Sequence, residues 1–142
     1  MTTLLIPVDG SDYSLKAVDY AASRARESKS PVEAHLLNVQ MQIASVNVKL
    51  FVSAESLESY YRDEGQRALE VALARAKSAG LTATPHIGVG DPAKIIMDYA
   101  SDKKVNEIVM GSHGRGALTG AFLGSVAQKV VHLSPVPVVL VK

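Results

Sequence analysis

The sequence predicts an α/β fold, a doubly wound five-stranded parallel sheet with helices on both faces. Strand-like apolar segments alternate with segments whose apolar residues recur at helical spacing, which is the pattern of successive strand–helix–strand units. The first strand-like segment, TLLIPV, is apolar on both faces, as in strands covered by helices on either side. The length of 142 residues is typical of one domain. We therefore expect a single Rossmann-like domain over residues 1–142 with strand order 3-2-1-4-5.

The first half of the sequence supplies two strands and two helices. Residues 3–8 form the first strand, turn residues then begin a helix over 12–27, and residues 32–40 form the second strand. Residues 55–79 carry a one-sided apolar pattern that indicates a long helix, and Gly80 follows where a left-handed C-cap would lie.

The connection over residues 41–54 has no clean hydrophobic period. A connection of this length inside a compact domain is more often a lid or a binding loop than a spacer. A partly helical excursion over the surface fits the same residues equally well. The sequence leaves both interpretations open.

The second half continues the alternation. Residues 82–90 form the third strand, which we place at an edge of the sheet because Pro85 lacks a backbone donor. Asp91 and Pro92 have the residue types of an N-cap and a first helical position. The remaining elements are a strand over 106–111, a glycine-rich segment, a helix that ends at Ser134-Pro135, and a last strand over 136–141.

Composition excludes several function classes. The 15 basic and 14 acidic residues give a net charge of +1, and they form no block of one sign, so we expect no nucleic-acid partner and no membrane association. The absence of cysteine excludes disulfides, thiolate metal sites and cysteine nucleophiles. The N-terminal residues MTTLLIPVDGSD have neither a basic region nor a long apolar run, so we expect a cytoplasmic protein.

Glycine is concentrated after the fourth strand. Ligands of doubly wound sheets bind where the strand order reverses, so this segment and Asp9, after the first strand, should meet at one crevice. Gly111 and Gly114 would let backbone N–H groups approach a phosphate, and glycine also permits the positive φ of an anion-binding loop. Gly124 and Ser125 begin a helix, whose N-terminus can hold a second phosphate. The alternative is a mobile glycine-rich loop.

The spacing of these residues is G-x2-G-x9-G-[ST], which resembles the ATP-binding signature of the universal stress protein family. The segments IPVDGSDYS, MGSHGRG and SPVPVVLVK resemble family blocks in the same order, so the resemblance covers essentially the whole chain. It implies an ATP-binding stress-response regulatory protein, with Mg²⁺ as the companion ion, that signals through conformation or partner binding. It also implies a homodimer through the last strand, an apolar edge that a second copy would cover.

Carried over position by position, the resemblance implies a set of nucleotide-binding residues. Asp9 would lie near ribose or a phosphate-bound Mg²⁺, although a plain helix N-cap is also compatible with it. Val39 would meet adenine through its backbone, although an ordinary strand valine would look the same. Apart from the resemblance, Arg115 is a candidate partner for a terminal phosphate, because its guanidinium group suits phosphate oxygens. The full predicted set is Pro7, Val8, Asp9, Val39, Met110, Gly111, Gly114, Arg115, Gly124, Ser125 and Val126.

Efficient ATP hydrolysis is not expected. A P-loop would need a lysine directly before Ser125, and Gly124 stands there instead. We find no residue placed to activate water, so nucleotide retention without rapid turnover is the primary hypothesis. The alternative is a slow Mg²⁺-dependent ATPase or self-phosphorylating enzyme that uses Asp9.

The four histidines are not expected to bind metal. His35, His86 and His132 lack metal-ligand spacing and are interpreted as structural or surface residues. His113, within the glycine segment, could contact phosphate, but a solvent-facing loop position is the expectation.

Overall fold

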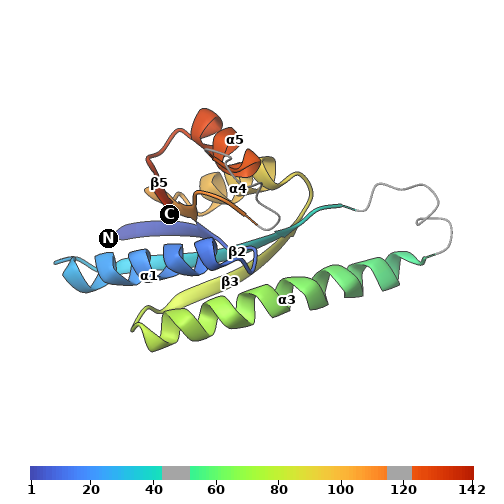
Figure 1. Ribbon diagram of the computed structural model, residues 1–142, viewed down its shortest axis with the longest axis horizontal. Helices are drawn as coiled ribbons and strands as arrows, with labels where there is room; N and C mark the ends of the chain where they lie inside the picture. Colours follow the sequence, from blue (N-terminus) through green and yellow to red (C-terminus); the bar gives the residue numbers. More distant parts are fainter. Residues whose placement is uncertain (43–51, 115–122) are drawn as a thin grey trace.

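The computed structural model describes residues 1–42, 52–114 and 123–142. Its sheet is entirely parallel and has five strands in the order β3-β2-β1-β4-β5, with helices on both faces (Figure 1). The predicted fold class and strand order are confirmed. The strands are β1 (Thr2–Pro7), β2 (Val32–Gln40), β3 (Ala83–Val89), β4 (Glu107–Gly111) and β5 (Val138–Val141), and the helices are α1 (Asp12–Glu27), α3 (Ala54–Ser78), α4 (Pro92–Asp102) and α5 (Ser125–Leu133).

Each face of the sheet has its own hydrophobic cluster. On one face Leu4 and Ile6 of β1 pack with residues of α1 and α3. On the other face Leu5 packs with residues of α4 and α5, among them Ile96 and Val130. All three β1 side chains are at most 1% exposed. The strand is therefore apolar throughout because helices cover both of its sides.

The strand order reverses between β1 and β4. From β1 the chain moves outward through β2 to β3, and it then returns to place β4 on the other side of β1. Pro85 lies on β3, where its register partner is Leu36 of β2, and the outer side of β3 is an edge as predicted. The reversal point is where a doubly wound sheet opens a crevice at the carboxyl ends of its strands.

Two predicted helix boundaries are confirmed in detail. Gly80 follows α3 with a φ of 80°, and its N–H donates to the carbonyl of Lys77 at 3.1 Å. Asp91 is the N-cap of α4 and accepts a hydrogen bond from the N–H of Lys94 at 3.2 Å. Most of the 41–54 connection lies outside the described residues, so the structure does not test the two hypotheses about it. Its last residue, Ala54, is already the first residue of α3.

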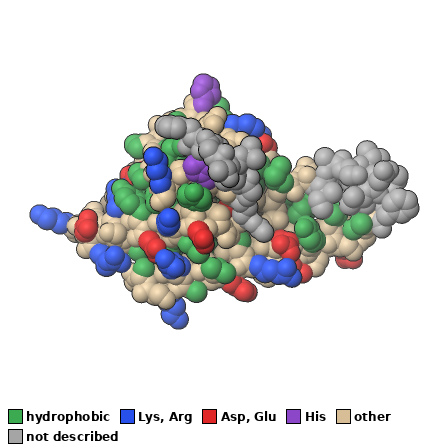
Figure 2. Space-filling view, in the orientation of Figure 1, with side chains coloured by type: hydrophobic (Ala, Val, Ile, Leu, Met, Phe, Trp, Pro, Cys, Tyr) green, Lys and Arg blue, Asp and Glu red, His purple; other side chains and the backbone are tan. Residues whose placement is uncertain are grey.

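The face of the molecule drawn in Figure 2 is mixed in charge. Acidic and basic side chains are interspersed on it. The long helix α3 spans 25 residues and buries only one side, which includes Leu69, Ala72 and Ala76. Within the described ranges, no helix combines the length and the apolar character that crossing a membrane requires.

Candidate functional site

A pocket of about 630 Å³ opens at the carboxyl ends of the central strands, within the size range of small-molecule sites. The ends of β1, β2 and β4 form its floor, and the first turns of α4 and α5 form part of its wall. Its lining residues are Pro7, Val8, Asp9, Ser14, Leu37, Val39, Met41, Pro92, Ile96, Met110, Gly111, His113, Gly114, Leu123, Gly124, Ser125, Val126, Ala127 and Gln128.

Every predicted site position that the structure describes lines this one pocket. These positions are Pro7, Val8, Asp9, Val39, Met110, Gly111, Gly114, Gly124, Ser125 and Val126. Arg115 lies outside the described residues. The contribution of α4, which brings Pro92 and Ile96 to the pocket, was not predicted from the sequence. The topology alone could have indicated it, because the helix that follows a parallel strand begins at the carboxyl edge of the sheet.

Asp9 belongs to the turn before α1 and is not the N-cap of that helix. Its Oδ1 accepts a hydrogen bond from the N–H of Ser11 at 2.9 Å, which is the geometry of a side-chain-closed turn. Ser11 is the N-cap, and its hydroxyl accepts from the N–H of Ser14 at 3.2 Å. The N-cap interpretation of Asp9 was therefore wrong. The turn holds its carboxylate at the pocket.

Two glycines of the motif lie very close to neighbouring protein atoms. A Cβ on Gly111 would lie 2.7 Å from the Cβ of Tyr13 and 2.9 Å from its carbonyl carbon. A Cβ on Gly114 would lie 2.7 Å from Oδ2 of Asp9. Neither glycine has φ in the left-handed region, which among the described glycines occurs at Gly10, Gly80 and Gly90. The expectation that Gly111 and Gly114 use positive φ was wrong. Gly111 is packed against the backbone of Tyr13, whereas Gly114 faces the end of the Asp9 side chain.

The N-terminus of α5 directs backbone donors toward the pocket. The first helical hydrogen bond runs from the N–H of Gln128 to the carbonyl of Gly124 at 3.0 Å, so the N–H groups of residues 125–127 have no acceptor within the helix. The N–H of Gly124 itself donates to the carbonyl of Ser112 at 2.8 Å. The first turn of α5 contains no acidic residue, so no carboxylate of that turn offsets the positive end of its dipole.

His113 is half-buried rather than solvent-facing. It lines the pocket, its Nδ1 shares a hydrogen bond of 2.9 Å with Oγ of Ser112, and its ring packs against that of Tyr13. The solvent-facing expectation was wrong because α1 approaches this segment closely.

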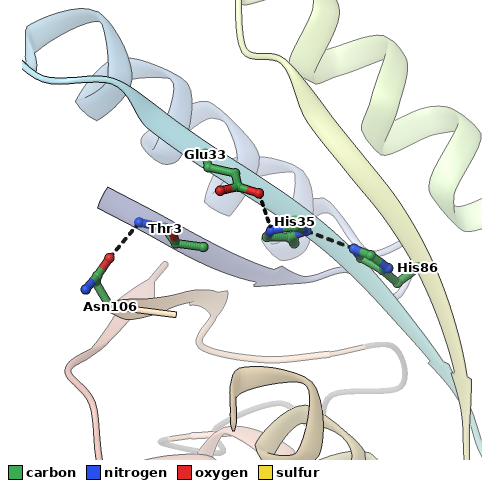
Figure 3. A network of polar contacts seen from close by, with 5 residues as sticks. All are labelled: Thr3, Glu33, His35, His86 and Asn106. Carbon is green, nitrogen blue, oxygen red and sulfur yellow. Dashed lines mark hydrogen bonds and ion pairs between the residues drawn. The ribbon is translucent and has the colours of Figure 1, made fainter. Parts of the chain in front are cut away.

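A second polar network lies away from the pocket and joins β2 to β3 (Figure 3). Nδ1 of His35 and Nε2 of His86 are 2.9 Å apart, and Nε2 of His35 is 3.0 Å from Oε1 of Glu33. Burial lowers the pKa of His86, and His35 and Lys103 lower it further by charge repulsion. Within the described part of the chain, no three histidine or carboxylate side chains converge on a metal position. His35 and His86 hold the two strands together, which agrees with the structural role predicted for them.

Comparison with known proteins identifies the family of this chain. A family model described as the universal stress protein family matches residues 1–142. The chain belongs to the universal stress protein family. Universal stress protein MJ0531 of Methanocaldococcus jannaschii is 35% identical over 145 residues, which cover 98% of this chain and 81% of that protein.

Solved structures of universal stress proteins share the fold. Protein MJ0577 of the same archaeon superposes with a TM-score of 0.84 at 29% identity, covering 99% of this chain and 95% of that one. A universal stress protein in complex with cAMP superposes with a TM-score of 0.74 at 28% identity, covering 99% and 97% of the two chains.

Proposed function

We propose that this universal stress protein is an ATP-binding regulatory protein of the cytoplasm. It retains an adenine nucleotide at the carboxyl ends of β1 and β4, within a single domain over residues 1–142, and signals stress through conformation or partner binding. The observation that carries the proposal is the convergence of all the described motif-derived positions on one pocket of about 630 Å³. The cAMP complex of a similar protein supports the adenine nucleotide class.

The two sides of the pocket suit the two ends of a nucleotide. The β2 and α4 side is aliphatic, with Leu37, Val39 and Ile96 among its lining residues, and would accept the base. The β4 and α5 side offers the N–H groups at the start of α5, and helix N-termini are suited to bind phosphates. Ser125 adds a hydroxyl at the same place.

Mg²⁺ fits this site only together with nucleotide phosphates. Asp9 contributes one carboxylate, and no group of three ligand side chains forms among the described residues. Mg²⁺ is commonly held by one or two carboxylates and the phosphates of a substrate, so this donor set matches a phosphate-bound ion. Asp9 would hold the ion, which would neutralise phosphate charge next to that carboxylate.

We propose binding without efficient turnover. The lysine of a P-loop is absent before Ser125, so the terminal phosphoryl group would lack a main stabiliser of its transition state. The competing proposal, a slow ATPase or self-phosphorylating enzyme, draws on the carboxylate of Asp9 at the pocket. Stoichiometric retention of nucleotide would support binding without turnover, and steady release of ADP would support the enzyme proposal.

We also propose a homodimer through β5. Its four residues, Val138–Val141, are all apolar and all only partly buried. The strand lies at an edge of the sheet, where unpaired backbone groups favour pairing with another strand. A two-fold axis would let two copies of β5 cover each other.

Native mass spectrometry of freshly purified protein tests these proposals together, because it reports bound nucleotide and subunit number at once. The expected species is a dimer that carries one adenine nucleotide per chain. Titration with ATP and GTP in Mg²⁺ follows, and GTP should bind more weakly if the side near Val39 reads adenine. Protein that carries no nucleotide and does not bind added ATP would contradict the proposed function.

A further inference from the structure

The first turn of α1 lies directly against the end of β4. The space that a side chain of residue 111 would fill is occupied by Tyr13, whose Cβ, carbonyl carbon and carbonyl oxygen would lie 2.7, 2.9 and 3.0 Å from such a Cβ. This approach fixes where the Tyr13 side chain leaves the helix. It leaves beside the segment that follows β4, the segment that carries His113.

The ring of Tyr13 packs on the ring of His113. Their centroids are 5.1 Å apart and the planes are inclined by 44°, within the range of favourable aromatic pairs. Both residues are half-buried. In addition, Nδ1 of His113 shares a hydrogen bond of 2.9 Å with Oγ of Ser112. The imidazole is therefore held both by a ring contact and by a hydrogen bond.

Ser112 is itself fixed, which makes it a firm anchor. It is 0% exposed. Its N–H donates to the carbonyl of Val141 at 2.8 Å, and its carbonyl accepts from the N–H of Gly124 at 2.8 Å. The backbone of His113 is also close to the start of α5, because a Cβ on Gly124 would lie 3.2 Å from the Cα of His113. His113 thus stands at the part of the pocket that Gly124 and Ser125 line.

We propose that Tyr13 is a positioning residue of the nucleotide pocket, whose ring holds His113 where the imidazole contacts the phosphates of an adenine nucleotide. This inference rests on the proposed function. Tyr13 lies outside the glycine motif and acts through His113 without touching the ligand. The physical basis is pre-organisation, because a side chain already held in its bound orientation loses less conformational freedom when the ligand binds.

Calorimetric titration of four variants with Mg²⁺–ATP tests this role. Tyr13→Phe keeps the ring and should bind within about twofold of the wild type, whereas Tyr13→Ala should raise Kd by about threefold to tenfold, the range of one aromatic pair. His113→Ala should raise Kd at least as much. In the double variant, Tyr13→Ala should add almost nothing to His113→Ala, because the ring acts through the imidazole.

Adenosine separates positioning from a general structural effect. It lacks phosphate, so its affinity should be unchanged by Tyr13→Ala. Tyr20→Ala is the matched control, since Tyr20 lies on the same helix and its ring faces Arg24. Neither tyrosine lines the pocket itself, but the ring of Tyr13 packs on His113. Replacement of Tyr20 should therefore leave both affinities unchanged. Tyr13→Leu keeps apolar bulk without the ring, and it should weaken ATP binding even if Tyr13→Ala does not fold.

The outcomes distinguish this inference from the function on which it rests. A wild-type protein that binds no adenine nucleotide would overturn the proposed function. If the wild type binds ATP and folded Tyr13→Ala and Tyr13→Leu bind it equally well, the positioning role is wrong. The role is also wrong if the Tyr13 and His113 effects are fully additive, or if adenosine loses as much affinity as ATP.

Discussion

Oδ2 of Asp9 lies 2.7 Å from the position that a Cβ on Gly114 would occupy. Asp9 follows β1 and Gly114 follows β4, so this short distance lies between the two segments that the strand reversal brings together. A distance below 3.0 Å is shorter than real Cβ contacts. Any side chain at position 114 must therefore displace the Asp9 carboxylate or the loop.

Gly114→Val should abolish stabilisation by nucleotide. ATP that binds only the folded state contributes about 2.7 kcal/mol at a hundredfold excess over Kd, which corresponds to a rise in Tm of about 5–11 °C for a domain of this size. The wild type should show this rise by differential scanning fluorimetry in Mg²⁺–ATP, and Gly114→Val should not. Ser125→Ala, which removes a hydroxyl but keeps the backbone donor, should only reduce it. A folded Gly114→Val protein with the full rise would contradict the phosphate assignment.

Gly111→Ala should act on folding, even without nucleotide. The added Cβ would meet the backbone of Tyr13 at 2.9–3.0 Å, and backbone of a helix yields less easily than the end of a side chain. Overpacking of this kind typically costs about 1–3 kcal/mol. Gly124→Ala, whose closest contact would be 3.2 Å, should cost less. Urea unfolding of the apo proteins measures both, and equal losses would show that the Tyr13 contact is not the cause.

The fold could be predicted because its signals are local. The apolar residues on both sides of β1 indicate a buried strand. Pro85 indicates an edge strand, and Gly80 indicates the end of α3. Each of these signals depends only on residues nearby in the sequence. The glycine spacing also indicated a segment whose described residues line the pocket. The spacing did not indicate which residues lie against these glycines, because a glycine does not identify its neighbour.

The contacts that the sequence did not predict are long-range. Tyr13 and His113 are far apart in the chain, and so are His35 and His86 on β2 and β3. Neither pair leaves a periodic pattern, because each depends on the register of strands and on how near α1 comes to β4. Such distances follow from tertiary packing, which a single sequence does not specify residue by residue.

Removal of residues 138–142 should destroy the proposed dimer. These residues form β5 and the end of the chain, and β5 also pairs with β4, so the truncated protein should be monomeric or aggregated. The truncation also removes the pairing of β5 with β4 inside each chain. Val139→Lys is a milder variant, because it keeps the strand and places a charge on the edge. Size-exclusion chromatography with light scattering measures the molar mass of each variant in solution. A stable, folded dimer for both variants would rule out β5 as the interface.

Turnover should stay far below one per second. Without a P-loop lysine the reaction lacks a stabiliser whose loss typically costs about 10²–10³ in rate. A coupled assay of ADP release in the presence of Mg²⁺ and ATP measures the turnover rate of the wild type and of Asp9→Asn. A rate in the ordinary enzyme range of roughly 1–10³ per second that Asp9→Asn abolishes would favour the enzyme proposal instead.

Stability should fall in mild acid because of His86. Burial and the neighbouring His35 and Lys103 lower its pKa. Glu33 is hydrogen-bonded to His35, and the ring of Tyr99 packs near that of His86. Glu70 of α3 lines the same surface pocket as His86. In the unfolded chain a histidine titrates near about 6.5, so below that pH the unfolded state binds the proton more readily. The resulting stability is fully present above about pH 6.5 and is lost as the pH falls through the lower folded pKa.

His86→Gln tests this dependence because glutamine removes the titration and retains a polar partner for His35. The urea midpoint of the wild type should drop between about pH 7.5 and about pH 5, and that of His86→Gln should drop less. His132→Gln is the control, since His132 is an exposed residue of α5 and should keep the wild-type slope. The Glu33–His35–His86 network is a proton-linked contact between β2 and β3 only if the slope changes with His86 and not with His132.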